Sequence, residues 1–320
     1  MRRWIVRAAV SAAVVTILLL LIPFDAVRSA LSRVSPWVWA ASVVIFFAGH
    51  YLNALKLRWL LGHSARGLMS ACVRAQYAGL VANLGLPGLA GGDIVRAAYL
   101  SPLTGVKQVA IASVADRMID TLTVLLLIVI ALPFAGLPDA MAGVAVEAGL
   151  WLAGGAAALL VIGVMLLRVP RFRRASAGLR EVWSTIAARR AALAGAVTIS
   201  LVVQSAFVIT NVWLAEQVGV TTAVAAWFVA WPLSKLIAVL PISLGGIGVR
   251  EAALVSLLGF YGAPNEAVLA SGILWQAVLI VTGVVGLIIT QLLPRADVAV
   301  ALSAGHQDRY SSPASEGTKT

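Results

Sequence analysis

The sequence predicts an all-α polytopic membrane protein, built as an inverted-topology repeat with two re-entrant broken-helix pairs. Three observations support this prediction. The 320-residue chain is 61% hydrophobic and only 12% charged, with a mean hydropathy of +0.97, which is too apolar for a water-soluble fold of this length. A 15-residue segment recurs 154 positions later. Both copies interrupt a hydrophobic stretch with a proline and a pair of glycines.

The two copies cover 86–100 and 240–254. Leucine, proline, both glycines, valine, arginine, alanine and the final leucine recur in register, so 8 of 15 positions are identical. The same offset places 37–61 over 191–215. A chance match in a chain rich in Gly, Ala and Leu is the alternative, but the aligned flanks favour a repeat of about 37–136 and 191–290. Paired Gly/Pro-broken helices in matching halves indicate the binding site of a secondary transporter.

Hydrophobicity and charge give the expected elements in order. The start of the chain resembles a signal peptide, but no Ala-x-Ala cleavage site follows, so we expect a retained first helix. The arginine-rich loop 168–190 and both chain ends are expected in the cytoplasm, whereas 137–147 and 217–226 carry no cation and are expected outside. Full spans are expected at about 7–23, 37–61, 109–136, 148–167, 193–216 and 267–293.

Two segments, 67–107 and 227–262, must begin and end on the same side of the membrane if these orientations hold. A helix over 73–86 would be about 21 Å long at 1.5 Å per residue, and the hydrocarbon core is about 30 Å thick. We therefore expect two half-helices that meet near the midplane in each segment. The alternative is that each half-helix is a complete tilted span.

One transmembrane domain is expected over 1–295, followed by a polar, disordered cytoplasmic tail at 296–320. We expect the chain in the cell inner membrane. The net charge of +11 follows from the positive-inside rule, so no nucleic-acid partner is expected. The expected partners are membrane lipids with an anionic headgroup, and a homo-oligomer or a lipid-synthesis partner stays open.

The arginines of the repeat, Arg96 and Arg250, follow Gly91-Gly92 and Gly245-Gly246 by four to five residues. Bare backbone N–H groups, the positive end of a half-helix and a guanidinium would together suit a phosphate headgroup. The alternative is that the two arginines pair with Asp93 and Glu251 to hold the broken helices together. Lys235 is either a third cation of the site or a side chain that snorkels to the interface.

Acidic residues inside a span are costly, at about 2.5–3.5 kcal/mol each, and are functional candidates. Asp116 and Asp120 lie at i and i+4 on one helix face, and Arg117 lies within reach of Asp120. Either Arg117 neutralises one carboxylate or one of them holds a proton. These three charged residues are therefore either a buried ion pair that locks the helix in place, or a relay for protons or cations. Lys56, Arg58 and Arg66 are expected to be cytoplasmic anchors.

Several polar residues within the expected spans would line a polar path or simply bond between helices. These residues are Gln76, Asn83, Gln204, Asn211 and Gln276. His50 is expected to be structural, and no metal site is predicted. The sequence contains no Walker A motif, no His-Glu-x-x-His and no Gly-x-Ser-x-Gly, so we expect neither a cofactor nor an enzyme.

Two segments resemble the flippase-like transmembrane domain of lysylphosphatidylglycerol synthases and their stand-alone relatives. The first combines Leu86-Pro87, Gly91-Gly92-Asp93, Arg96-Ala97 and Leu100 with 112–120, and the second combines Leu240-Pro241 with Gly245 to Leu254. The resemblance covers roughly 5–295. The family commonly has a glutamate where Asp116 stands here.

The resemblance implies a membrane domain that moves a lipid between leaflets, without the soluble domain that makes the aminoacylated lipid. We therefore expect a lipid translocator that moves an anionic phospholipid or a lipid-linked precursor by alternating access. A membrane-embedded enzyme acting on lipid phosphates and a non-transporting scaffold subunit of a lipid- or envelope-synthesis complex are the alternatives.

Overall fold

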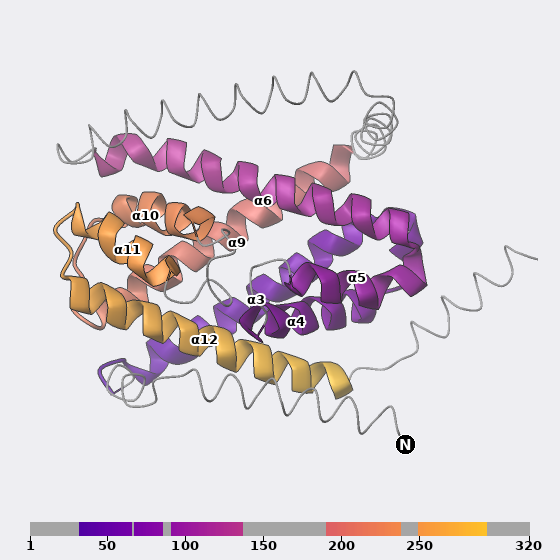
Figure 1. Cartoon of the computed structure of the whole chain (residues 1–320), viewed down its shortest axis with the longest axis horizontal. Helices are drawn as coiled ribbons and strands as arrows, with labels where there is room; N and C mark the ends of the chain where they lie inside the picture. Colours follow the sequence, from indigo (N-terminus) through magenta and orange to yellow (C-terminus); the bar gives the residue numbers. More distant parts are fainter. Residues whose placement is uncertain (1–31, 66, 86–90, 137–189, 238–248, 293–320) are drawn as a thin grey trace, which may run out of the picture.

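The computed structural model describes residues 32–65, 67–85, 91–136, 190–237 and 249–292. These residues form eight α-helices and one short 3₁₀ helix, η1 (Gly62–Ala65), and they contain no strand. The helices keep the labels of Figure 1. The expected all-α fold of a polytopic membrane protein is confirmed for this part of the chain.

Four helices are long and apolar enough to cross a membrane: α3 (Pro36–Leu61), α6 (Val106–Ala135), α9 (Arg190–Glu216) and α12 (Asn265–Leu292). The shortest has 26 residues and is about 39 Å long at 1.5 Å per residue, more than the hydrocarbon core requires. They coincide with four of the expected spans. The expected spans 7–23 and 148–167 and the tail 296–320 lie outside the described residues.

Proline and glycine set the limits of these long helices. Pro36 occupies the first turn of α3, where its missing N–H has no helical partner to lose. Gly62 follows the helix with a φ of 70°, and Gly136 follows α6 with the same φ. This left-handed conformation suits glycine and ends a helix.

Four shorter helices form two pairs: α4 (Met69–Gly85) with α5 (Gly91–Thr104), and α10 (Val224–Ile237) with α11 (Val249–Gly259). The longest of them has 17 residues, or about 26 Å, so none would cross a hydrocarbon core of about 30 Å without tilt or thinning. The members of each pair pack against each other. In Figure 1 the two pairs lie towards opposite ends of the long axis.

The two halves repeat the same order of helices, with α3, α4, α5 and α6 followed by α9, α10, α11 and α12. Contacts between the halves are reciprocal, because α4 packs against α12 and α10 packs against α6. In Figure 1 α6 runs away from α5 towards one end, whereas α12 runs in the opposite direction. Reciprocal pairing and opposed direction are what an inverted repeat requires; its inversion across a membrane stays a prediction.

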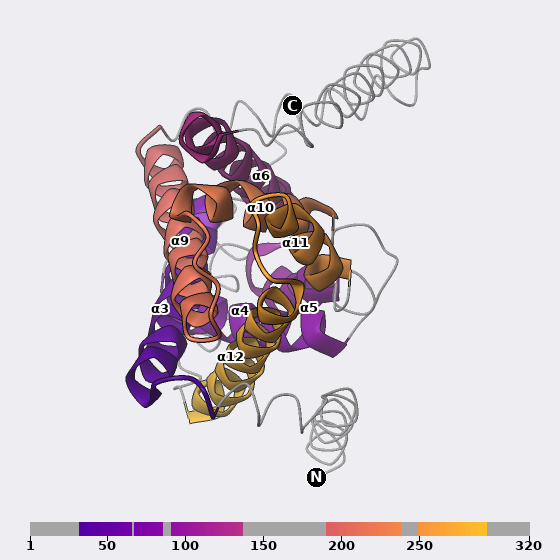
Figure 2. The same ribbon diagram turned by 90° about the vertical axis from the view of Figure 1, so that its left-hand side faces the viewer.

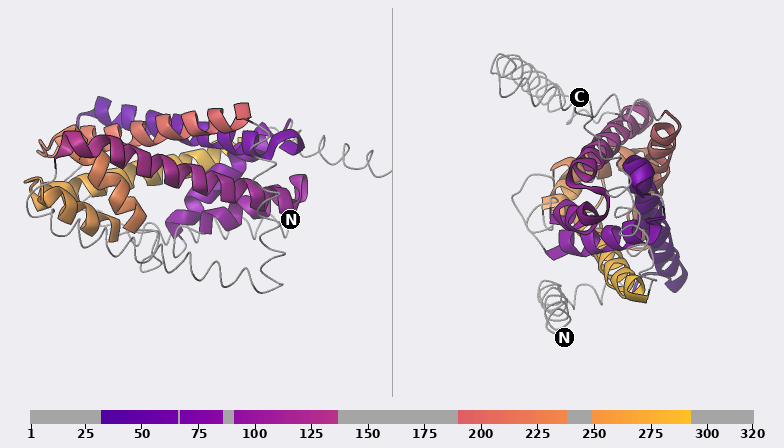
Figure 3. Two further views of the ribbon diagram at one scale, coloured as in Figure 1. Left: turned by 90° about the horizontal axis from the view of Figure 1, so that it is seen from above. Right: turned by 90° about the vertical axis from the view of Figure 1, so that its right-hand side faces the viewer.

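The halves join along α3 and α9, which lie side by side in Figure 2 and pack against each other. The long helices follow the longest axis of the molecule in both Figure 1 and the left view of Figure 3. Because the first helix of each half forms this seam, residues on their facing sides come from both copies of the repeat.

Two apolar cores flank the middle of the bundle. Along α3, Phe46 belongs to one core and Ala54 to the other, and His50 lies between them at four-residue steps. Along α9, Ala196 and Val208 belong to opposite cores, separated by polar residues at the same spacing. Residues four apart share one helix face, so both helices present a polar belt between two apolar zones.

Candidate functional site

The polar belt lines a cavity of about 220 Å³ between the two halves. Helices α3, α4, α5, α6, α9, α10, α11 and α12 all contribute residues to its wall. The charged residues singled out in the sequence that line it are Arg96, Asp116, Arg117, Asp120, Lys235 and Arg250. The two repeat arginines, which lie 154 positions apart in the chain, therefore share one site.

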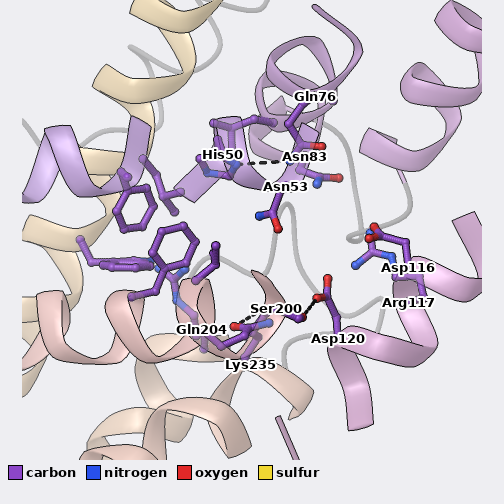
Figure 4. A pocket seen from close by; sticks show the side chains of 18 of the residues that line it. His50, Asn53, Gln76, Asn83, Asp116, Arg117, Asp120, Ser200, Gln204 and Lys235 are labelled. Carbon is purple, nitrogen blue, oxygen red and sulfur yellow. Dashed lines mark hydrogen bonds between the residues drawn. The ribbon is translucent and has the colours of Figure 1, made fainter. Parts of the chain in front are cut away.

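Lys56 forms ion pairs with both aspartates of α6 from across the helix interface. Its Nζ lies 2.9 Å from Asp116 Oδ1 and 2.7 Å from Asp120 Oδ1. The lysine side chain is only 1% exposed, and Ser200 of α9 also donates a hydrogen bond to Asp120. Figure 4 shows Ser200 and Asp120 directed towards each other. The expectation that Lys56 anchors the protein in the cytoplasm is wrong, because this ammonium is buried against two carboxylates.

Arg117 also differs from its expected role. Its Nη2 and Nε lie 2.6 and 2.8 Å from Asp93 Oδ2, so the guanidinium binds the carboxylate on α5 rather than Asp120 on its own helix. Arg96 pairs with the other oxygen of Asp93 and lies 3.5 Å from Asp116 Oδ2. Asp93 thus joins two arginines, and Arg96 links α5 to α6.

The equivalent arginine of the second half has a different environment. Arg250 pairs with Glu251, the next residue on α11, and its Nη2 donates to Gln276 Oε1 at 3.2 Å. Its guanidinium carbon lies 5.3 Å from the ring centroid of Trp231, within the range of a cation–π contact. Gly272 makes room for this arrangement, because a Cβ there would lie 2.9 Å from Glu251 Cγ.

Lys235 lines the same cavity from α10. Its Nζ donates to Gln204 Oε1 at 3.0 Å, and the two side chains lie next to each other in Figure 4. None of the carboxylates in the described segments forms an ion pair with it. The other four cations of this site each pair with a carboxylate, whereas the contact of Lys235 within the described segments is to a neutral amide.

The glycines that open α5 pack the α4–α5 pair tightly. Gly91 and Gly92 are buried, and a Cβ on Gly92 would lie 2.5 Å from Gly79 O. The N–H of Gly92 already donates to Asn83 Oδ1 at 2.6 Å, so this amide is occupied by the protein rather than open to a headgroup. Gly245 and Gly246 lie outside the described residues.

One wall of the cavity is aromatic. Phe46 stacks on Phe207 with ring centroids 4.2 Å apart, and it meets Trp275 edge-on at the same separation. Trp231 meets Trp275 edge-on at 4.6 Å. These rings come from α3, α9, α10 and α12, and the sequence analysis did not single them out, because large apolar residues in a membrane protein usually mark only packing.

The polar residues of the expected spans divide between the two roles left open for them. Gln76, Asn83, Gln204 and Gln276 line the cavity. Asn211 instead donates to Phe207 O of its own helix at 2.8 Å. His50 also lines the cavity, with Nδ1 3.4 Å from Gln76 Nε2.

Comparison with known families identifies the architecture. The sequence profile of the lysylphosphatidylglycerol synthase TM region matches residues 4–286, a range that includes every residue that lines the cavity. No curated protein and no solved structure matches the chain at a significant level. With most of its length covered, the chain belongs to the family of the lysylphosphatidylglycerol synthase transmembrane region.

Proposed function

We propose that this protein is a lipid translocator of the cell inner membrane that moves an anionic phospholipid or lipid-linked precursor between leaflets by alternating access. The observation that supports it best is the cavity between the halves, which brings cations from both repeats into the middle of an apolar bundle. Charged residues at such depth are costly unless a polar ligand or path requires them. Inverted repeats that rock about a shared site are a common basis of alternating access.

The size of the cavity fits a headgroup. Pockets that enclose drug-sized ligands have volumes of about 300–1,000 Å³. The cavity between the halves, at about 220 Å³, is smaller than these pockets. A lipid would place its headgroup among the charges and leave its acyl chains in the surrounding bilayer. Only the headgroup then needs a polar route between leaflets.

The ion pairs suggest how an empty site is held. Asp93 and Glu251 occupy Arg96 and Arg250, and a phosphate that enters the cavity would compete with these carboxylates for the guanidinium groups. Asp116, Arg117 and Asp120 set the charge around them. Binding energy would thus be coupled to the contacts that join α5 to α6 and α11 to α12.

The same pairs favour transport over chemistry on the lipid. A membrane enzyme that acts on lipid phosphates commonly needs free carboxylates for a metal ion or for proton transfer. Asp116 and Asp120 are instead bound by Lys56, and Asp93 by two arginines. We therefore assign no catalytic step to this site.

Leaflet exchange in liposomes tests the proposal. Purified protein should speed the exchange of fluorescently labelled phosphatidylglycerol, measured by quenching the outer leaflet, and Arg250→Ala should abolish the increase. Arg190→Ala is the matched control, because it removes an exposed arginine at the start of α9. No increase with the wild-type protein, or full exchange with a folded Arg250→Ala variant, would contradict the assigned role.

A further inference from the structure

The charges around the cavity do not balance. In the first half three cations, Lys56, Arg96 and Arg117, pair with three carboxylates of α5 and α6. In the second half Arg250 pairs with Glu251. Among the described residues Lys235 contacts Gln204 alone, so the charges of these residues around the cavity sum to an excess of one positive charge.

From this excess we propose that Lys235 marks the seat of a headgroup with a single negative charge, a phosphodiester that carries no amine. This inference rests on the proposed function and specifies its substrate class. In this assignment the main contact of the anion is Lys235 of the second half rather than the paired arginines. The first-half cluster then acts as a neutral lock between α3, α5 and α6.

The hydrogen bonding of Lys235 supports this assignment. An ammonium has three donors, and within the described segments it makes one hydrogen bond, to Gln204 Oε1 at 3.0 Å. A cation without a counter-ion is costly away from bulk water. A phosphodiester oxygen would supply both the missing charge and the missing acceptors.

Neutral donors of two other residues that line the cavity point to a ligand rich in acceptors. Trp275 Nε1 and Gln276 Nε2 are buried and have no hydrogen-bond partner among the described residues. The orientation of the Gln276 amide is set by Arg250, which donates to Gln276 Oε1. Both unpartnered groups can therefore only donate.

His50 adds a third donor by the same reasoning. Gln76 Oε1 accepts from Arg96 Nη1 at 3.1 Å, so Gln76 Nε2 is the atom that faces His50 Nδ1 and donates to it. The proton of a neutral imidazole then sits on Nε2, which has no partner among the described residues. Phosphoryl and glycerol oxygens can accept from such donors, whereas the ammonium of an amine headgroup cannot.

The charge excess also separates classes of phosphate. A phosphodiester carries one negative charge, whereas a phosphomonoester carries about −1.5 to −2 at pH 7. One surplus cation matches the diester. A zwitterionic lipid would add its own cationic group to a site that already has one more positive than negative charge.

Binding of short-chain lipids to the full-length protein in detergent tests the selectivity by isothermal titration calorimetry. Dihexanoyl phosphatidylglycerol should bind about 10- to 100-fold more tightly than dihexanoyl phosphatidylcholine or phosphatidylethanolamine, the effect of one charged hydrogen bond. Glycerophosphoglycerol and inorganic phosphate, titrated separately, distinguish a free anion from a lipid headgroup. Equal affinity for the zwitterionic lipids, or tighter binding of inorganic phosphate, would overturn the assignment.

Variants at Lys235 locate the contact. Lys235→Met should lose most of the preference for phosphatidylglycerol, and Lys235→Arg should keep it. Lys107→Met removes an exposed lysine at the start of α6 and should bind like the wild-type protein. Thermal unfolding separates ligand binding from a structural role: Lys235→Met should unfold at or above the wild-type temperature without ligand, yet lose the upward shift that the lipid produces. An unchanged shift in Lys235→Met would overturn the proposal.

Comparison with leaflet exchange keeps the two proposals separable. If the wild-type protein binds the diester selectively through Lys235 but exchanges no lipid, the translocator function fails and the binding site stands. If Lys235→Met exchanges phosphatidylglycerol as fast and as selectively as the wild-type protein, the site assignment fails and translocation stands.

Discussion

Lys56 Nζ lies 2.7 Å from Asp120 Oδ1, although the two residues are 64 positions apart and belong to different helices. Because the lysine also contacts Asp116, one buried ammonium holds a pair of carboxylates one helical turn apart. The repulsion expected between the two aspartates is thus relieved by α3 rather than by a neighbour on α6. This contact fixes α3 against α6 at the edge of the cavity.

Removal of this lysine should destabilise the protein. Lys56→Met leaves the buried carboxylate of Asp116 and the partly exposed carboxylate of Asp120 with reduced compensation, and breaking a buried pair from one side costs about 3–5 kcal/mol. The free energy of unfolding, measured by circular dichroism during titration of the detergent-solubilised protein with dodecyl sulfate, should fall by about that amount.

A second substitution should restore much of this loss. In Lys56→Met/Asp120→Asn the unpaired charge at Asp120 is gone, and Asp116 keeps Arg96 within 3.5 Å. Arg117→Gln provides a contrast, because its side chain is 43% exposed and such a pair contributes about 1 kcal/mol or less. A loss in Lys56→Met no larger than in Arg117→Gln would show that the buried lysine is not a structural lock.

Release of Arg250 from its carboxylate should strengthen anion binding. Glu251→Gln removes the charge that Arg250 contacts and leaves a side chain of similar shape. If a phosphate competes with this carboxylate, affinity for dihexanoyl phosphatidylglycerol should rise about tenfold by calorimetry, the effect of about 1.4 kcal/mol. Glu266→Gln, at an exposed position in the first turn of α12, serves as a charge-matched control. Weaker binding in Glu251→Gln would mean that the pair forms part of the ligand site.

The contact between α4 and α12 depends on glycine at position 286 of α12. A Cβ there would lie 2.1 Å from Tyr77 Cδ1 of α4, so Gly286→Ala should cost about 1–3 kcal/mol of unfolding free energy through overpacking. Gly259→Ala is the matched control, since the nearest atom to its Cβ would be 3.5 Å away. Equal free energies of unfolding for the two variants would show that α4 and α12 can accommodate the added methyl group without cost.

Sequence alone predicts the long helices and the broken pairs because both depend on local features. Continuous apolar residues mark α6 and α12, and Pro-Gly interruptions mark the breaks before α5 and α11. The 154-residue offset also predicts which helices are equivalent. Their reciprocal packing, α4 with α12 and α10 with α6, follows from the repeat only once the halves are assembled.

The charged site was only partly predictable. Arg96, Asp116 and Arg250 are recognisable because ionisable residues are rare inside spans. Their partners depend on tertiary packing: Arg117 binds Asp93 across the helix interface, although Asp120 is closer in sequence. Lys56 sits near the end of a span, where an interfacial anchor is the usual interpretation, and only the approach of α6 shows that it is buried.

Cross-linking of the two halves tests the central claim, that they move about the cavity to carry a lipid. Tyr77 Cγ lies 2.7 Å from the position of a Cβ on Gly286, so two cysteines there would have Cβ atoms within about 4.2 Å, in the range of a disulfide. In a Cys72→Ala background, Tyr77→Cys/Gly286→Cys should exchange labelled phosphatidylglycerol when reduced and stop when oxidised, while Cys72→Ala alone responds to neither treatment. Undiminished exchange by the fully cross-linked protein would contradict the account.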